Sequence, residues 1–134
     1  MVARLDRQSL ILLGAAVVAG LGIAYWHANR PTGVAVRVPA LSAEAQLGRA
    51  MFERSCVVCH GPNASGTKSG PPLIHKVYES NHHSDQAFHR AVQKGVRAHH
   101  WPFGDMPPVG DVKPSEVNLI VRYVRELQRA NGIF

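Results

Sequence analysis

The sequence predicts an all-α protein in which one N-terminal membrane-spanning helix precedes a small helical domain. Three observations support this fold class. Residues 8–26 form an uncharged apolar run, three later segments repeat apolar residues at helical spacing, and no strand pattern competes strongly with them. We therefore expect a membrane anchor over residues 1–30, an extended linker over 31–40 and one domain over 41–134.

The apolar run is long enough to cross a membrane. Its roughly 17–19 residues, each rising about 1.5 Å in a helix, just span a hydrocarbon core of about 30 Å. Arg4 and Arg7 precede it, so the positive-inside preference places the N-terminus in the cytoplasm and the later domain outside. A cleaved signal peptide is the alternative, but Tyr25 and Trp26 directly follow the small residues at the exit, and such aromatic residues favour a retained anchor.

Small residues recur every four positions along this segment, at Ala16, Gly20 and Ala24. This spacing puts them on one helix face, where two helix backbones can approach closely. It suggests a helix–helix partner within the membrane, although alanine and glycine are common in such segments.

The linker and the helices of the domain are marked by residues that stop or start a helix. Prolines at both ends of residues 31–40 make an extended conformation the expectation. Ser42, Ser84 and Ser115 are candidate N-caps for three helices. The apolar positions of these helices are Leu47, Ala50, Met51 and Phe52; Phe88, Ala91, Val92 and Val96; and Val117, Ile120, Val121, Val124 and Leu127. Loops rich in glycine and proline separate them, and Asn131 with Gly132 ends the last one.

The two cysteines of the chain both lie in the motif Cys56-Val57-Val58-Cys59-His60. Two thiols at this spacing can each form a thioether with one vinyl group of a porphyrin, and the adjacent histidine can then bind the iron. A thioredoxin-like redox pair or a zinc site would also use two such cysteines. No βαβ pattern and no second Cys/His pair at zinc spacing accompany the motif, so covalent attachment of one haem c is the expectation.

The order of features in residues 41–134 resembles that of class I c-type cytochromes. Gly48 and Phe52 resemble the glycine and aromatic residue of the first helix in that family, and Tyr123 resembles the aromatic residue of the last helix that meets them. The Gly-Pro-Pro-Leu run resembles the stretch whose proline carbonyl accepts a hydrogen bond from the proximal histidine. The resemblance implies that Pro71 accepts this bond from His60 Nδ1, which would orient the ring and raise its basicity.

The sixth iron ligand is expected to be Met106. It lies in a Met-Pro-Pro run before the last helix, far enough after His60 to reach the other face of the ring, and it matches the axial methionine of the family. Met1 lies across the membrane, and Met51 is expected in the core. A thioether ligand favours ferrous iron and raises the reduction potential.

Histidines and aromatic residues near Met106 leave alternatives open. His99 or His100 could replace Met106 as a ligand, and the histidine pairs could bind a second metal. Trp101 and Phe103 are candidate haem-pocket residues, with the Trp101 indole N–H as a donor to a propionate or simply a core-filling group.

Net charge indicates the class of partner. After Arg30 the chain has twelve Lys and Arg against eight Asp and Glu, a formal +4. Lys68 and Lys76 flank the loop near the expected haem, and Arg90, Lys94 and Arg97 fall on or near the second predicted helix of the domain. They predict docking to an acidic redox protein such as an oxidase or dehydrogenase. No nucleic-acid partner is expected, because the domain is predicted to be exported and no basic stretch is interleaved with aromatic residues. The arginines of the last helix, at 122, 125 and 129, are expected on its solvated face.

These observations predict a mono-haem electron carrier in a bacterial inner membrane, with the haem domain in the periplasm, acting as a shuttle or as a subunit of a larger redox complex. The alternatives are a haem enzyme or gas sensor in which Met106 is displaced, and a metal-handling protein that uses the histidine pairs.

Overall fold

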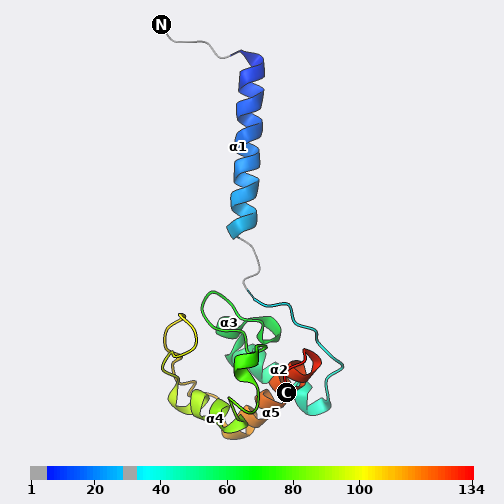
Figure 1. The fold of residues 1–134 in the computed structure, drawn as a ribbon, viewed down its shortest axis with the longest axis vertical. Helices are drawn as coiled ribbons and strands as arrows, with labels where there is room; N and C mark the ends of the chain where they lie inside the picture. Colours follow the sequence, from blue (N-terminus) through cyan, green and yellow to red (C-terminus); the bar gives the residue numbers. More distant parts are fainter. Residues whose placement is uncertain (1–5, 29–32) are drawn as a thin grey trace. The chain divides into compact units, whose positions relative to one another are not determined.

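The computed structural model describes residues 6–28 and 33–134, and the chain divides between residues 31 and 32 into two units. Its helices are α1 (Arg7–Ala28), α2 (Ala43–Ser55), α3 (Val57–His60), α4 (Asp85–Lys94) and α5 (Pro114–Ala130), with 3-10 turns η1 (Pro62–Ala64) and η2 (Lys76–Tyr78) (Figure 1). The described residues contain no strand, only an isolated bridge between Val96 and Met106. The all-α prediction is confirmed.

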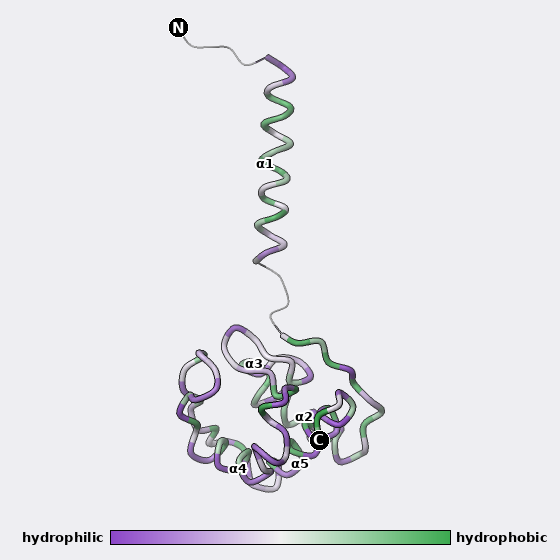
Figure 2. The backbone as a smooth tube through the Cα atoms, in the orientation of Figure 1, coloured by the Kyte–Doolittle hydropathy of each residue, from purple (hydrophilic) through white to green (hydrophobic). Residues whose placement is uncertain are grey.

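Helix α1 forms the first unit by itself. Within Arg7–His27 an 18-residue window has a mean hydropathy of 2.0 and contains no buried residue, so length and composition both suit a membrane span. Figure 2 shows the apolar character along most of the helix. Asp6 caps its start by accepting a hydrogen bond from the Ser9 backbone nitrogen at 2.8 Å. Arg4, on which the predicted orientation partly depends, lies outside the described residues.

The segment after residue 32 is extended, and it binds the surface of the second unit. The Val34 nitrogen donates to the Ser65 carbonyl at 2.8 Å. Arg37 exchanges two hydrogen bonds of 2.8 Å with the Asn131 side chain, and Val36 packs against the core. Pro31 lies outside the described residues. The backbone groups of this segment are therefore satisfied partly by the domain that follows.

The core of the second unit is the crossing of α2 and α5. Gly48 makes the crossing possible, because a Cβ at this position would overlap the Leu119 carbonyl. The buried rings of Phe52 and Tyr123 meet edge to face there, with centroids 5.6 Å apart. The helix-packing roles implied by the family resemblance are present. Tyr123 also donates its hydroxyl to Asn63 Oδ1 at 3.2 Å, which ties the crossing to the loop after α3.

The helix starts agree only partly with the prediction. Ser42 caps α2 through a hydrogen bond from the Ala45 nitrogen at 3.2 Å. The N-cap of α5 is Lys113, so the prediction of Ser115 is wrong. Proline is preorganised for the first helical position, so the helix begins at Pro114, earlier in the sequence than predicted. The Glu116 carboxylate then accepts a hydrogen bond from the Lys113 nitrogen at 2.8 Å.

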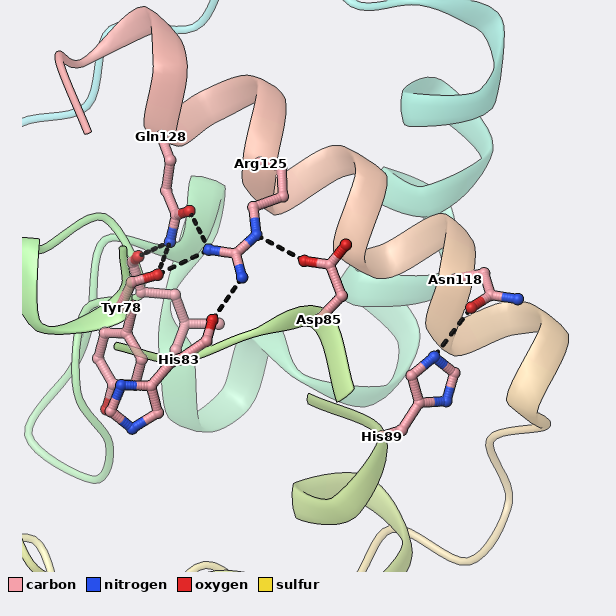
Figure 3. Close-up of polar contacts among 8 residues, drawn as sticks. Tyr78, His83, Asp85, His89, Asn118, Arg125 and Gln128 are labelled. Atoms are coloured by element: carbon pink, nitrogen blue, oxygen red, sulfur yellow. Dashed lines mark hydrogen bonds and ion pairs between the residues drawn. The ribbon is translucent and has the colours of Figure 1, made fainter. Parts of the chain in front are cut away.

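Arg125 is buried, so the prediction that it lies on a solvated face is wrong, whereas Arg122 and Arg129 are exposed. Figure 3 shows its guanidinium among polar groups of the segment before α4, of the start of α4 and of α5 itself. It donates to Asp85 Oδ1 at 2.9 Å and to the Tyr78 carbonyl and Gln128 Oε1 at 2.7 Å, and it also contacts the His83 carbonyl. A buried charge is tolerated because these acceptors replace water.

Candidate functional site

The two cysteines lie on a short helical turn at the end of α2. Cys56 ends α2 and begins α3, and its carbonyl accepts a hydrogen bond from the His60 nitrogen at 2.9 Å. Cys56 is half-buried and Cys59 is exposed, and both are free thiols. The turn therefore presents two thiols and an imidazole from five consecutive residues.

The imidazole of His60 is fixed by the predicted hydrogen bond to Pro71. Its Nδ1 lies 2.9 Å from the Pro71 carbonyl oxygen. A carbonyl only accepts, so Nδ1 carries the proton and Nε2 keeps its lone pair. Burial lowers the pKa of His60, and the bond to Pro71 opposes this shift. The ring is consequently held in the neutral form that binds a metal ion.

The electrostatics of Cys56 argue against a redox-active cysteine pair. Burial, with a smaller contribution from Cys59, raises the pKa of the Cys56 thiol to about 11. Reactive CxxC motifs depend instead on a lowered thiol pKa. Among the described residues, neither cysteine belongs to a cluster of His, Cys, Asp and Glu side chains that could hold a metal ion.

The loop after α3 places the Pro71 carbonyl within hydrogen-bond distance of the His60 ring. Thr67 donates its hydroxyl to the Cys59 carbonyl at 2.6 Å, and the Gly66 nitrogen donates to the His60 carbonyl at 2.6 Å. The loop is thus hydrogen-bonded back onto the same turn that carries the thiols. The loop that carries Pro71 and the turn that carries His60 are therefore hydrogen-bonded to each other.

Met106 is held mainly through its backbone. The Met106 nitrogen donates to the Val96 carbonyl and the Met106 carbonyl accepts from the Val96 nitrogen, both at 2.9 Å. Gly95, at φ +74°, allows these two segments to approach, because a Cβ at this position would overlap the Met106 carbonyl. The intervening loop is closed a second time by a 2.8 Å bond from the Ala98 nitrogen to Asp105 Oδ1. Met106 is half-buried, whereas Met51 packs against the core, as expected.

Trp101 supplies a buried donor without a partner. Its indole Nε1 is buried and makes no hydrogen bond within normal geometric limits, although its interaction with the Tyr78 hydroxyl opposes the rise that burial causes in the Tyr78 pKa. The Trp101 ring lies edge-on to His75 at 5.0 Å and near Phe103 at 6.1 Å. An orphaned N–H is costly unless a bound acceptor satisfies it. The donor fits the carboxylate of a haem propionate, and the neutral His60 and two free thiols fit the iron and the vinyl groups.

A family model described as Cytochrome c matches residues 45–128, which is more than half of the chain. The chain belongs to the cytochrome c family. Its cofactor is therefore one covalent haem c, and its function is haem-based electron transfer. The match includes the Cys56–His60 motif and Met106, and α1 lies outside it. Neither the curated proteins nor the solved structures include a significant match to this chain.

The buried polar network formed by Arg125 and Gln128 was not predicted from the sequence. Gln128 is buried beside Arg125 and donates to the carbonyls of Leu73 and Tyr78 at 2.9 and 3.1 Å. A signal was present, because Arg125 and Gln128 each follow an apolar residue of α5 by four positions and so share its buried face. The charge of Arg125 favours the solvent-exposed interpretation made from the sequence, and no location was predicted for Gln128.

Proposed function

We propose that this cytochrome c is a membrane-anchored mono-haem electron carrier in which Cys56 and Cys59 form the thioethers, and His60 and Met106 bind the iron. The observation that carries the proposal is the hydrogen bond from His60 Nδ1 to Pro71, because it leaves Nε2 free beside the two thiols. The haem supplies one-electron chemistry between ferric and ferrous iron. The protein's task is then to hold two axial ligands and to exclude other ligands from the metal.

Each residue of the site would contribute separately to that task. The neutral His60 ring needs no deprotonation to bind, and its bond to Pro71 prevents rotation. The Met106 thioether would favour the ferrous state and occupy the second axial position. Trp101 would satisfy its buried N–H on a propionate, with Phe103 beside it as an apolar wall. With both axial positions filled, the site favours electron transfer over reaction with a bound substrate.

The optical spectrum and haem extraction test this arrangement together. We expect the haem to remain with the polypeptide after denaturing electrophoresis and acid-acetone extraction, because thioethers survive both. We also expect the ferrous holoprotein to bind carbon monoxide slowly or not at all. Extractable pigment would contradict the thioethers, and rapid carbon monoxide binding would favour an enzyme or gas sensor.

The anchor is the second part of the proposal. Helix α1 suits a span, and Arg7 at its start is consistent with a cytoplasmic N-terminus and a periplasmic haem domain in a bacterial inner membrane. N-terminal sequencing of the mature chain should recover residues before Leu10. A start at Tyr25 would contradict the anchor and show a processed protein.

Docking to an acidic redox protein is the third part. Val58 is 82% exposed and Cys59 is exposed, so the attachment turn reaches the surface. Lys68 follows Thr67, which bonds Cys59, and Arg97 follows Val96, which pairs with Met106; both basic side chains are exposed. Positive charge thus flanks the site from both sides and would accelerate encounter with an acidic surface.

Charge reversal tests the docking surface. In native membranes, Lys68→Glu and Arg97→Glu should each slow haem reoxidation and reduce its dependence on salt. Arg129→Glu, an exposed position at the end of α5, serves as the control and should change little. Equal effects of all three changes would indicate a response to net charge alone. Co-purification in mild detergent then separates a free shuttle from a subunit of a complex.

A further inference from the structure

Four histidines from two segments that precede Met106 in the sequence gather at one place in the domain. His82 and His83 lie in the turn between η2 and α4, and His99 and His100 lie in the loop between α4 and Met106. The Nε2 atoms of His82 and His100 are 3.2 Å apart, and the His83 ring lies 5.2 Å from that of His100. Two segments that are separate in the sequence therefore bring their imidazoles together.

Hydrogen bonds to backbone carbonyls fix the protons of two of these rings. His83 Nδ1 lies 2.7 Å from the Val77 carbonyl, and His99 Nδ1 lies 2.7 Å from the Arg97 carbonyl. Because a carbonyl only accepts, both Nδ1 atoms carry protons and both Nε2 atoms keep lone pairs. Metal-binding histidines characteristically donate their second ring N–H in this way.

The contact between His82 and His100 needs a shared proton or a cation. Two Nε2 atoms at 3.2 Å cannot both be protonated or both be bare without repulsion. Tetrahedral coordination with metal–nitrogen bonds of 2.0–2.1 Å places ligand atoms about 3.3 Å apart. This pair already has that spacing, and one nitrogen from each of His82, His83 and His100 lies within 4.8 Å of the others.

Charge around the cluster is compatible with a cation. Burial, then His82, His99 and Arg125, lowers the pKa of His83, while its bond to Val77 opposes the shift. Arg125 is the adverse neighbour, but it is paired with Asp85 and directed to the His83 carbonyl rather than to the ring (Figure 3). The lowered pKa of His83 and the pairing of Arg125 with Asp85 are therefore both compatible with a bound cation.

We propose that His82, His83 and His100 form a binding site for a divalent transition-metal ion, separate from the haem. Imidazole ligands favour copper and zinc, and the Irving–Williams order makes Cu²⁺ the tightest of the divalent ions. Water or His99 would complete the coordination. His82 and His100 are exposed, so the ion can enter directly from solution.

Metal binding would fasten the distal loop to the rest of the domain. The turn carrying His82 and His83 is held by hydrogen bonds from α5, because Arg125 donates to the His83 carbonyl and Gln128 donates to the Tyr78 carbonyl. The loop carrying His100 also carries Trp101 and is drawn as an open ring in Figure 1. The ion would join the fixed turn to this loop, and it would stabilise the side of the domain that holds Met106.

Titration of the full-length holoprotein, without a histidine tag and after chelator treatment, tests the site. We expect one Cu²⁺ or Zn²⁺ per chain with micromolar or tighter affinity by calorimetry, beside one iron by metal analysis. Bound Cu²⁺ should show nitrogen hyperfine structure in its electron paramagnetic resonance spectrum. His82→Gln and His100→Gln should each weaken binding by about 10- to 100-fold or more, with an unchanged haem spectrum as proof of folding.

His89→Gln is the matched control. His89 lies on α4, its ring contacts Asn118 at 2.8 Å, and Figure 3 shows it apart from His83. It should bind the metal as the wild type does. No binding, equal binding by wild type and the double variant His82→Gln/His100→Gln, or an equal loss in His89→Gln would each overturn the site.

Discussion

The two sides of the haem site are built in different ways. On the proximal side, His60 belongs to a helical turn continuous with α2, and its ring is fixed by Pro71. On the distal side, Met106 follows an exposed loop and is held by paired backbone bonds to Val96. The proposed proximal ligand is thus oriented at its side chain, whereas the hydrogen bonds that position the proposed distal ligand involve its main chain. We expect the proximal side to be rigid and the distal side to be adjustable.

The largest effect should come from removing the attachment itself. Cys56→Ser with Cys59→Ser should abolish covalent haem completely, because no other cysteine exists in the chain. Haem-stained denaturing gels measure this. A stained band from the double variant would show that another bond holds the haem.

Loss of the distal ligand should be the next largest effect. Met106→Ala should open the iron to carbon monoxide and lower the reduction potential, because a ligand that favours ferrous iron is lost. A tenfold loss of that preference is about 59 mV for one electron, and we expect at least this shift in a redox titration. Met51→Leu is the control and should leave spectrum and potential intact. The reverse pattern would exclude Met106 as the ligand.

The helix crossing that supports the proximal side should tolerate no added methyl group. Gly48→Ala should destabilise the domain by about 3 kcal/mol in denaturant unfolding, because the new Cβ would meet helix backbone that cannot rotate away. Gly110→Ala adds the same group where nothing lies within 4 Å and should change stability by less than about 0.5 kcal/mol. Similar costs for the two changes would argue against a tight crossing.

Substitutions at two glycines with similar positive φ angles test how the backbone positions Met106. Gly95 and Gly104 have φ of +74° and +85°, but only at Gly95 would a Cβ overlap the Met106 carbonyl. Gly104→Ala should cost about 1 kcal/mol for its backbone conformation, and Gly95→Ala about 2 kcal/mol, since the exposed loop can shift to relieve part of the overlap. Only Gly95→Ala should weaken the Met-to-iron absorption band. Equal weakening by both would mean that Gly95 does not position Met106.

The smallest effect should be electrostatic. A hydrogen bond from Arg54 and one from the Lys113 nitrogen lower the pKa of Glu116. Its contribution to stability is therefore present above its unfolded-state pKa and is lost as the pH falls through the lower folded-state value. Thermal unfolding of Glu116→Gln should match the wild type at acidic pH and fall slightly below it at neutral pH. A constant difference at all pH values would contradict this linkage.

Sequence reasoning predicted most of the proximal side and less of the distal side. Cys56 and His60 lie within five consecutive residues, so their spacing indicates their mutual placement, whereas the bond from His60 to Pro71 was implied by the family resemblance. The pairing of Val96 with Met106 and the meeting of His83 with His100 join residues of different segments. Such contacts depend on how loops close over the core, which local periodicity does not encode. The burial of Arg125 was missed for the same reason, because two of its acceptors, the Tyr78 carbonyl and the Asp85 carboxylate, lie about 40 or more residues earlier in the chain.

The absorption spectrum of the purified ferric wild type is the most direct test of the two-ligand haem site. We predict a low-spin six-coordinate spectrum with a Met-to-iron charge-transfer band, which disappears in Met106→Ala and persists in Met51→Leu. A wild-type spectrum without that band, or with the band unchanged in Met106→Ala, would contradict the assignment of His60 and Met106 as the axial pair.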